Sequence, residues 1–373
     1  MKPVVVHLVE TYLGRSETFI HNYVASHVGW EPVVLCKFTA NAAEFPVPRQ
    51  LVVPAPVTKR DSAWWLNEAV GVVTGRSLWH RQAEEVLRGE RSQVIHAHFG
   101  QQGFMALPLK RALGVPLITT FYGYDMSVLP HLPRWATRLA RLFREGDRFL
   151  AEGPCMRQRL IELGAPAEKI RIQRIAIHPD RYPAWQPNRT GVPVVLFVGR
   201  FTEKKGLLDA LAAVREVVRR GQSVHFRIVG DGPLRPSVEQ FVAANGMAGY
   251  VEFLGMQPHP EVIRELTAAN VFIHPSRTAS NGDTEGGAPT IILEAQAVGV
   301  PIVTTRHADI PNVAPPGRGV FLSPEGEAGP LAENLWQALQ GAVGADPTFV
   351  RAQHDVRREV LHLEAHYQEL LSA

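Results

Sequence analysis

The sequence predicts an α/β protein made of two open, doubly wound parallel-sheet domains. Its 373 residues exceed the usual size of a single hydrophobic core, and 45% of them are hydrophobic. Short apolar runs alternate with helical patterns from residue 3 to 152, and the same alternation restarts at 194. The Pro-rich stretch 178–193 between the two series indicates a linker near 180–190.

In the first half, PVVVHLV (3–9) predicts the first strand, and Ser16 is the predicted cap of the helix that follows. The later apolar runs predict strands at 32–38, 94–99, 116–121 and 147–152. In the second half the predicted strands are 194–200, 225–232, 250–255, 271–276 and 301–305. The pattern of 356–371 predicts a terminal helix.

A helix is predicted at 289–298. Pro289 suits the first helical position because it has no amide donor to lose, and Gly299 stands where helices often end in a left-handed residue. Its apolar stripe, which faces a core, consists of Ile291, Ile292, Ala295 and Val298.

The start of this helix is suited to an anion. Gly287 and Ala288 leave the backbone uncovered, and a helix N-terminus carries about half a positive charge. Glu294 lies four residues after Thr290, roughly 6 Å along the axis, so its carboxylate could hold hydroxyl groups beside a bound diphosphate. An isolated helix glutamate is more often solvated, and here the neighbouring residues favour binding.

Two cations occupy the loop after the predicted strand 194–200. Arg200 and Lys205 suit a diphosphate, since arginine offers a planar fork and lysine a point charge. Lys204 is predicted to be merely solvated. The segment VGDGPLR (229–235) lacks the third glycine of a dinucleotide fingerprint, which argues against a nicotinamide site.

Composition excludes several classes of protein. A net charge of +3 and a pI near 8.9 are too weakly basic to indicate nucleic-acid binding. Cys36 and Cys155 form neither a disulfide framework nor a zinc motif. Because no signal peptide or membrane span is evident, we expect a cytoplasmic protein. The basic amphipathic stretch 134–148 is compatible with peripheral contact at the inner face of the membrane, but a helix that covers the sheet is favoured.

The segments VLFVGRFTEKKGL (195–207) and GDTEGGAPTIILEAQAVG (282–299) resemble the donor site of glycosyltransferase family 4, which are retaining enzymes with the GT-B fold. The resemblance implies catalytic roles for Arg200 and Lys205 at the leaving diphosphate and for Glu285 at the donor sugar. It places the nucleotide ribose on Glu294. The other implied donor-binding residues are Gly14, Gly199, Gly232, Met256, Gly286, Gly287, Ala288, Pro289 and Thr290.

On the acceptor side, HAHFG (96–100) and TTFYGYD (119–125) both follow predicted strands and contribute His98, Tyr122 and Asp125. Many relatives have a histidine where this chain has Tyr122. His96 and His98 with Asp125 could hold a metal, but without a third ligand at diagnostic spacing, histidines that line a core or cleft are favoured. We expect no cofactor and no required metal.

The resemblance implies GT-B architecture with two Rossmann-like domains facing across a cleft. The domains expected are an acceptor-side domain at 1–185 and a nucleotide-sugar domain at 186–349, with a helix at about 350–373 packing back onto the first. The implied activity is hexose transfer from a nucleoside diphosphate sugar, with a UDP-sugar favoured over GDP-mannose. The acceptor would be a hydroxyl of a glycan, a lipid-linked sugar or a natural product, and exopolysaccharide and colanic-acid enzymes are the members most resembled. A sugar-nucleotide epimerase and a non-catalytic sugar-nucleotide-binding protein are the alternatives.

Overall fold

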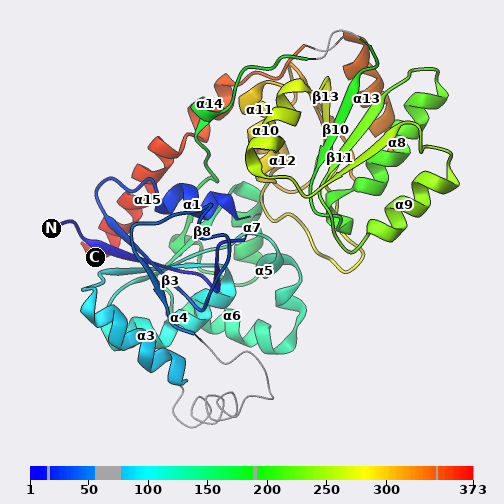
Figure 1. Cartoon of the computed structure of the whole chain (residues 1–373). Coiled ribbons are helices and arrows are strands. Elements are labelled where there is room, and N and C mark those ends of the chain that lie inside the picture. The colour runs from blue at the N-terminus through cyan, green and yellow to red at the C-terminus, as the bar shows by residue number, and fades with distance from the viewer. Residues whose placement is uncertain (15–16, 55–76, 188–190, 342, 373) are drawn as a thin grey trace. The chain divides into compact units, whose positions relative to one another are not determined.

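The computed structural model describes residues 1–14, 17–54, 77–187, 191–341 and 343–372. The chain forms two compact units, each with its own parallel sheet (Figure 1). The first unit comprises Met1–Ala176 and Val356–Ala373, and the second comprises Ile177–Asp355. The division after Ala176 lies slightly before the linker expected near 180–190, and the chain rejoins the first unit at Val356.

The first unit contains a seven-stranded sheet among its described residues, in the order β5-β3-β1-β6-β7-β8-β9, with parallel pairing throughout. Its strands are β1 (Val4–Leu8), β3 (Glu31–Cys36), β5 (Gln50–Val52), β6 (Val94–His98), β7 (Leu117–Thr120), β8 (Arg148–Ala151) and β9 (Ile170–Ile172). A small second sheet pairs β2 (Thr11–Tyr12) with β4 (Phe38–Thr39).

Helices cover both faces of this sheet (Figure 1). One face packs on α3 (Leu78–Gly89), α4 (Gly100–Leu113), α6 (Pro133–Glu145) and α7 (Pro154–Glu162), and the other packs on α1 (Thr18–Val24) and α15 (Val356–Leu371). Helix α1 has Glu17 at its N-cap, and Ser16, the predicted cap, lies outside the described residues. A short helix α5 (Tyr124–Ser127) follows β7.

Helix α6 corresponds to the basic amphipathic stretch 134–148, for which the sequence allowed either membrane contact or packing on the sheet. It buries Leu139, Leu142 and Phe143 in the core, as a helix covering the sheet should. Its arginines make local contacts: Arg141 pairs with Glu145 on the next turn. Among the described helices, none is both long and apolar enough to cross a bilayer.

The second unit contains a six-stranded parallel sheet among its described residues, in the order β12-β11-β10-β13-β14-β15. The strands are β10 (Val194–Val198), β11 (His225–Val229), β12 (Val251–Gly255), β13 (Val271–His274), β14 (Ile302–Thr305) and β15 (Val320–Ser323). The helices are α8 (Leu207–Arg219), α9 (Arg235–Ala244), α10 (His259–Ala268), α11 (Thr290–Val298), α12 (Ile310–Val313), α13 (Ala328–Gly341) and α14 (Thr348–Gln353). Parallel strands bring their carboxyl ends, and the loops that follow them, to one edge of the sheet.

Candidate functional site

The strongest polar cluster of the second unit lies where β10 and β13 end. After β10, a short 3₁₀ turn at Glu203–Lys205 directs the Lys205 side chain to the loop after β13. There Lys205 Nζ donates a hydrogen bond to Glu285 Oε2 at 2.8 Å, and Ser276 Oγ donates to Glu285 Oε1 at 3.1 Å. The Lys205 and Glu285 side chains are only 14% and 7% exposed. The structure thus joins two of the predicted site residues in a buried ion pair.

Burial and charge determine the protonation states in this cluster. Burial alone would raise the pKa of Glu285, but the charges of Lys205 and Lys204 outweigh it and bring the pKa down to about 2. Burial lowers the pKa of Lys205, and Glu285 opposes that effect. Burial and the Lys205 charge also lower the pKa of His274 to about 3, so this imidazole is neutral. Glu285 is therefore an ionised acceptor at neutral pH.

The backbone of Glu285 is fixed from a third strand. His307, just after β14, accepts the Glu285 amide hydrogen at Nε2 over 3.2 Å, while its Nδ1 donates to Glu325. Because Nδ1 holds the proton, Nε2 is free to accept. Three strand ends, those of β10, β13 and β14, therefore combine to hold one carboxylate.

The prediction for Lys204 is wrong. Its residue is only 8% exposed, and its Nζ donates at 3.0 Å both to Asp283 Oδ1 and to the Thr284 carbonyl. Lys204 is therefore an anchor that fixes the loop carrying Glu285. Arg200, by contrast, is exposed on the same loop, and its charge adds to the effects that lower the Lys205 pKa.

Glycines allow the strand-end loops to approach each other closely. A Cβ on Gly206 would lie 1.9 Å from the Pro275 carbonyl oxygen, and one on Gly230 would lie 2.0 Å from the Gly199 carbonyl oxygen. A Cβ on Gly232 would lie 2.8 Å from the Phe201 amide nitrogen. The glycines of VGDGPLR therefore serve to pack β11 against the loop after β10.

Gly206→Ala is expected to destabilise the protein much more than Gly221→Ala. Both glycines have positive φ, +67° and +89°, so both alanines are strained by about 1 kcal/mol, but only at Gly206 would the methyl group meet backbone. Overpacking adds about 1–3 kcal/mol, which is roughly 2–12 °C in melting temperature. Thermal unfolding followed by circular dichroism checks this, and equal melting temperatures for the two variants would contradict the close approach.

Helix α11 begins at Thr290 with Pro289 at the N-cap, one residue later than predicted, and ends as predicted at Gly299 with φ +89°. Gly286 and Gly287 turn their amides inward, to Thr284 Oγ1 and to the Glu285 carbonyl. The amides of Ala288 and Thr290 make no hydrogen bond within the part of the chain that the structure describes. The free donors at this helix start are therefore fewer than the run from Gly286 to Thr290 predicts.

Glu294 is on α11 and is only 5% exposed. Its Oε1 accepts a hydrogen bond from His259 Nε2 at 3.1 Å, and burial together with the nearby Glu294 charge raises the Tyr182 pKa. A carboxylate accepts about four hydrogen bonds, so acceptor capacity remains for a ligand. Met256, predicted near the base, is 52% exposed just after β12.

In the first unit, His98 and Tyr122 are in contact: His98 Nδ1 lies 2.6 Å from the Tyr122 hydroxyl. Asp125 lies nearby but is fully buried, and its carboxylate accepts the amides of Gly100, Tyr122 and Gly123 at 2.8–3.1 Å. Burial raises the Asp125 pKa while these amides oppose the rise. Asp125 therefore anchors two loops, whereas Gly14 donates its amide to Glu17 at 3.3 Å.

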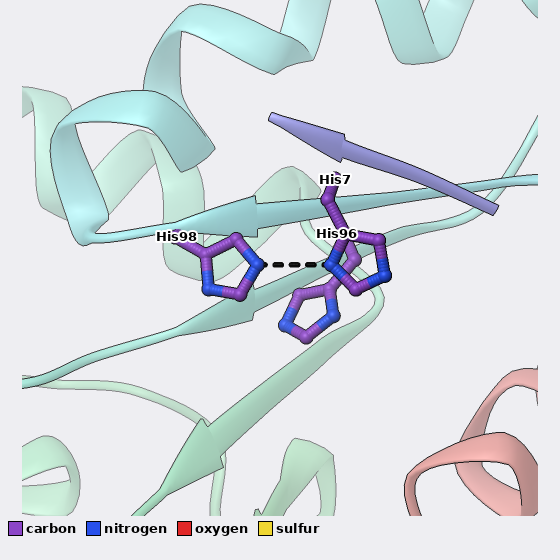
Figure 2. Close-up of side chains that lie close together, drawn as sticks. All are labelled: His7, His96 and His98. Carbon is purple, nitrogen blue, oxygen red and sulfur yellow. Dashed lines mark hydrogen bonds between the residues drawn. The ribbon is translucent and has the colours of Figure 1, made fainter. Parts of the chain in front are cut away.

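A histidine cluster takes the place of the metal set considered with Asp125. Figure 2 shows His7, His96 and His98 side by side, and each offers a ring nitrogen within 4.8 Å of the others. The sequence pattern does not single out His7, because this residue lies inside an ordinary apolar strand. Register explains the cluster, since His7 of β1 pairs with His96 of β6.

The chain matches two families in succession. Residues 20–174 match the family described as "Glycosyl transferase 4-like domain", and residues 192–341 match "Glycosyl transferases group 1". It is 34% identical over 285 residues to the putative colanic acid biosynthesis glycosyltransferase WcaL of Escherichia coli, covering 74% of this chain and 69% of WcaL. It is 32% identical to the amylovoran biosynthesis glycosyltransferase AmsK of Erwinia amylovora, covering 72% and 66%. The chain thus spans about two thirds of the length of these relatives.

Solved structures support the fold. The HepE protein of Anabaena in complex with UDP and glucose superimposes with a TM-score of 0.78 at 14% identity, over 98% of this chain and all of that one. Sucrose-phosphate synthase of Thermosynechococcus elongatus gives a TM-score of 0.75 at 16% identity, over the full length of both. Together, the two matched families, the identity to WcaL and the two parallel-sheet units show that the chain belongs to the family 4 glycosyltransferases and is a transferase of the GT-B fold.

Proposed function

We propose that this glycosyltransferase moves a hexose from a nucleoside diphosphate sugar, with retention, to a hydroxyl group in polysaccharide assembly. A UDP-sugar is the favoured donor and GDP-mannose the alternative, since HepE has been solved with UDP and glucose. The names of WcaL and AmsK refer to the biosynthesis of colanic acid and amylovoran, which supports a glycan or lipid-linked sugar as acceptor.

The observation that carries this proposal is the buried Lys205–Glu285 pair beside the start of α11. In the proposed site, Arg200 and Lys205 bind the diphosphate, and the free amides of Ala288 and Thr290 add donors at a helix N-terminus. Ionised Glu285 accepts hydroxyl groups of the donor sugar, and Glu294 accepts those of the ribose. Each of these groups is complementary to one part of a sugar nucleotide.

The same arrangement supports catalysis by charge stabilisation. As the bond to the sugar breaks, the sugar becomes oxocarbenium-like and negative charge grows on the departing diphosphate. Lys205 is already oriented by Glu285 at 2.8 Å, so it stabilises that charge without reorganising. We propose no protein nucleophile. The departing phosphate oxygen takes the proton of the acceptor hydroxyl.

The proposal predicts specific stabilisation by one class of nucleotide sugar. Purified protein is mixed with UDP-, GDP-, TDP- and ADP-sugars, and a ligand of the native state should raise the melting temperature. The donor so found should be transferred to an acceptor with an unchanged anomeric configuration by NMR, in excess EDTA as well as without it, because Arg200 and Lys205 supply the positive charge. An isomerised donor formed without acceptor would indicate an epimerase instead. Binding without transfer or hydrolysis across a broad acceptor panel would indicate a non-catalytic binder.

A further inference from the structure

A continuous line of hydrogen bonds crosses the first unit from Tyr122 to the C-terminal helix. The Tyr122 hydroxyl lies 2.6 Å from His98 Nδ1, and His98 Nε2 lies 3.0 Å from His7 Nδ1. His7 Nε2 lies 3.0 Å from His27 Nε2, and His27 Nδ1 lies 3.0 Å from Glu364 Oε1. Figure 2 shows the central link, between His7 and His98. We call these five residues the relay.

Strand periodicity explains why the relay exists. Every second residue of a strand points to the same face of the sheet. On the face covered by α15, strand β1 contributes Val5 and His7, and strand β6 contributes Val94, His96 and His98. Val5 and Val94 pack in the apolar core, and the histidines after them place their imidazoles further along the same face of the sheet. His7 and His98 are 0% and 1% exposed, and the His27 side chain is fully buried.

The number of protons gives the relay a direction. With one proton on each of the three imidazoles and one on the tyrosine hydroxyl, the relay holds four protons for its four hydrogen bonds, each of which needs one proton. An ionised Glu364 can only accept, so His27 must donate from Nδ1. His7 must then donate from Nε2 to His27, His98 from Nε2 to His7, and Tyr122 from its hydroxyl to His98.

Electrostatics favours this direction over its reverse. Burial alone would raise the Glu364 pKa, but hydrogen bonds from His27 and from the Gly29 and Val28 amides hold it below its usual value, so Glu364 is ionised. Burial lowers the pKa of His7 far below its usual value and that of His98 to about 3, which keeps both imidazoles neutral. The reverse direction would place a bare His27 nitrogen against the carboxylate.

We propose that the relay keeps the Tyr122 hydroxyl proton in its hydrogen bond to His98, so that Tyr122 acts toward a ligand as a hydrogen-bond acceptor. Tyr122 is half-buried at the end of β7, unlike the buried imidazoles behind it. Its hydroxyl group donates to His98, which leaves the lone pairs of the oxygen as acceptors. The preferred partner is a ligand hydroxyl that can donate. That this hydroxyl belongs to a sugar rests on the proposed function, whereas the direction of the relay does not.

The same histidines could instead hold a metal, and the structure favours the relay. His7 Nδ1 and His98 Nε2 face each other at 3.0 Å, the length of a hydrogen bond, and both nitrogens of His96 are also engaged, with Tyr367 and Thr120 at 2.7 Å. A metal would have to displace the proton that His7 and His98 share. The relay and the metal site therefore predict different protonation of His7 Nδ1 and His98 Nε2.

Tautomers can be measured directly in the whole protein labelled with ¹⁵N-histidine. Long-range ¹H–¹⁵N correlation at pH 7.5 should show His98 and His7 protonated at Nε2, and His27 protonated at Nδ1. His98 protonated at Nδ1 would overturn the proposal, as would stoichiometric bound zinc that is lost in His7→Gln. Neither result depends on transferase activity, so failure of the relay and failure of the proposed function remain distinguishable.

Two variants test what the relay does for Tyr122. His27→Phe keeps a ring of similar shape but disconnects Glu364, so the His98 signals should shift toward Nδ1 protonation and turnover should fall at least about tenfold. Tyr122→Phe should cause a similar loss of turnover. Tyr367→Phe is the matched control, because it removes a hydroxyl bonded to buried His96 without interrupting the relay. An unchanged His98 tautomer in His27→Phe, or equal losses in Tyr367→Phe, would overturn the proposal.

Discussion

Lys205→Ala is expected to lower transferase turnover by about 10²–10³-fold, because removing one preoriented group that stabilises developing charge has effects of that size. Lys205 should also contribute to ground-state binding, so affinity for the nucleotide diphosphate should fall by roughly 10–100-fold, the cost of one charged hydrogen bond. Turnover with the donor found in the thermal screen and isothermal titration with UDP measure the two effects separately.

A structural defect could imitate this result, because the variant leaves Glu285 buried without its partner. Breaking a buried pair costs about 3–5 kcal/mol, so Lys205→Ala should also melt at a lower temperature. The double variant Lys205→Ala/Glu285→Gln removes both charges and should recover much of that stability while remaining inactive. Arg219→Ala, which removes an exposed cation at the far end of α8, is the control and should match the wild type. A double variant that regains activity would contradict the role proposed for Lys205.

The sequence was sufficient to predict most of the alternating strands and helices of the fold. The run 194–200 begins with five apolar residues, the length of a buried strand, and the structure has β10 there. Gly299 marked a helix end because only a left-handed residue fits, and the helix ends there. The strands that were not predicted, including β2, β5 and β15, are two to four residues long, too short for periodicity to distinguish them from loops.

Contacts between distant residues account for what the sequence did not reveal. Lys204 and Lys205 are neighbours in an apparently solvated charge run, yet each finds its own carboxylate about 80 residues later, at Asp283 and Glu285. Glu364 closes the relay through His27, 337 positions away. Local pattern carries no information about such pairs. One signal was available for His274 and Ser276, since VFIHPS places polar residues where a parallel strand ends.

Glu294→Ala is expected to weaken UDP binding by roughly 10–100-fold, because the carboxylate is proposed to accept hydrogen bonds from the ribose and a hydrogen bond to a charged group is worth about 1.5–3 kcal/mol. Lost affinity alone would not identify the ribose as the partner. Glu294 also accepts a hydrogen bond from His259, so its removal could disturb α10 and α11 instead.

A thermodynamic cycle that changes both the protein and the ligand distinguishes a ribose contact from a structural disturbance. Wild-type protein should bind UDP more tightly than an analogue lacking the ribose hydroxyl that contacts Glu294, and 2′-deoxy- and 3′-deoxy-UDP test the two candidates. In Glu294→Ala that preference should vanish, because the carboxylate that reads the hydroxyl is gone. His259→Gln removes a neighbour but leaves the carboxylate, so it should keep the preference even if overall affinity drops. A Glu294→Ala variant that still favours UDP over both analogues would place the ribose elsewhere, because a merely structural defect weakens all three nucleotides alike.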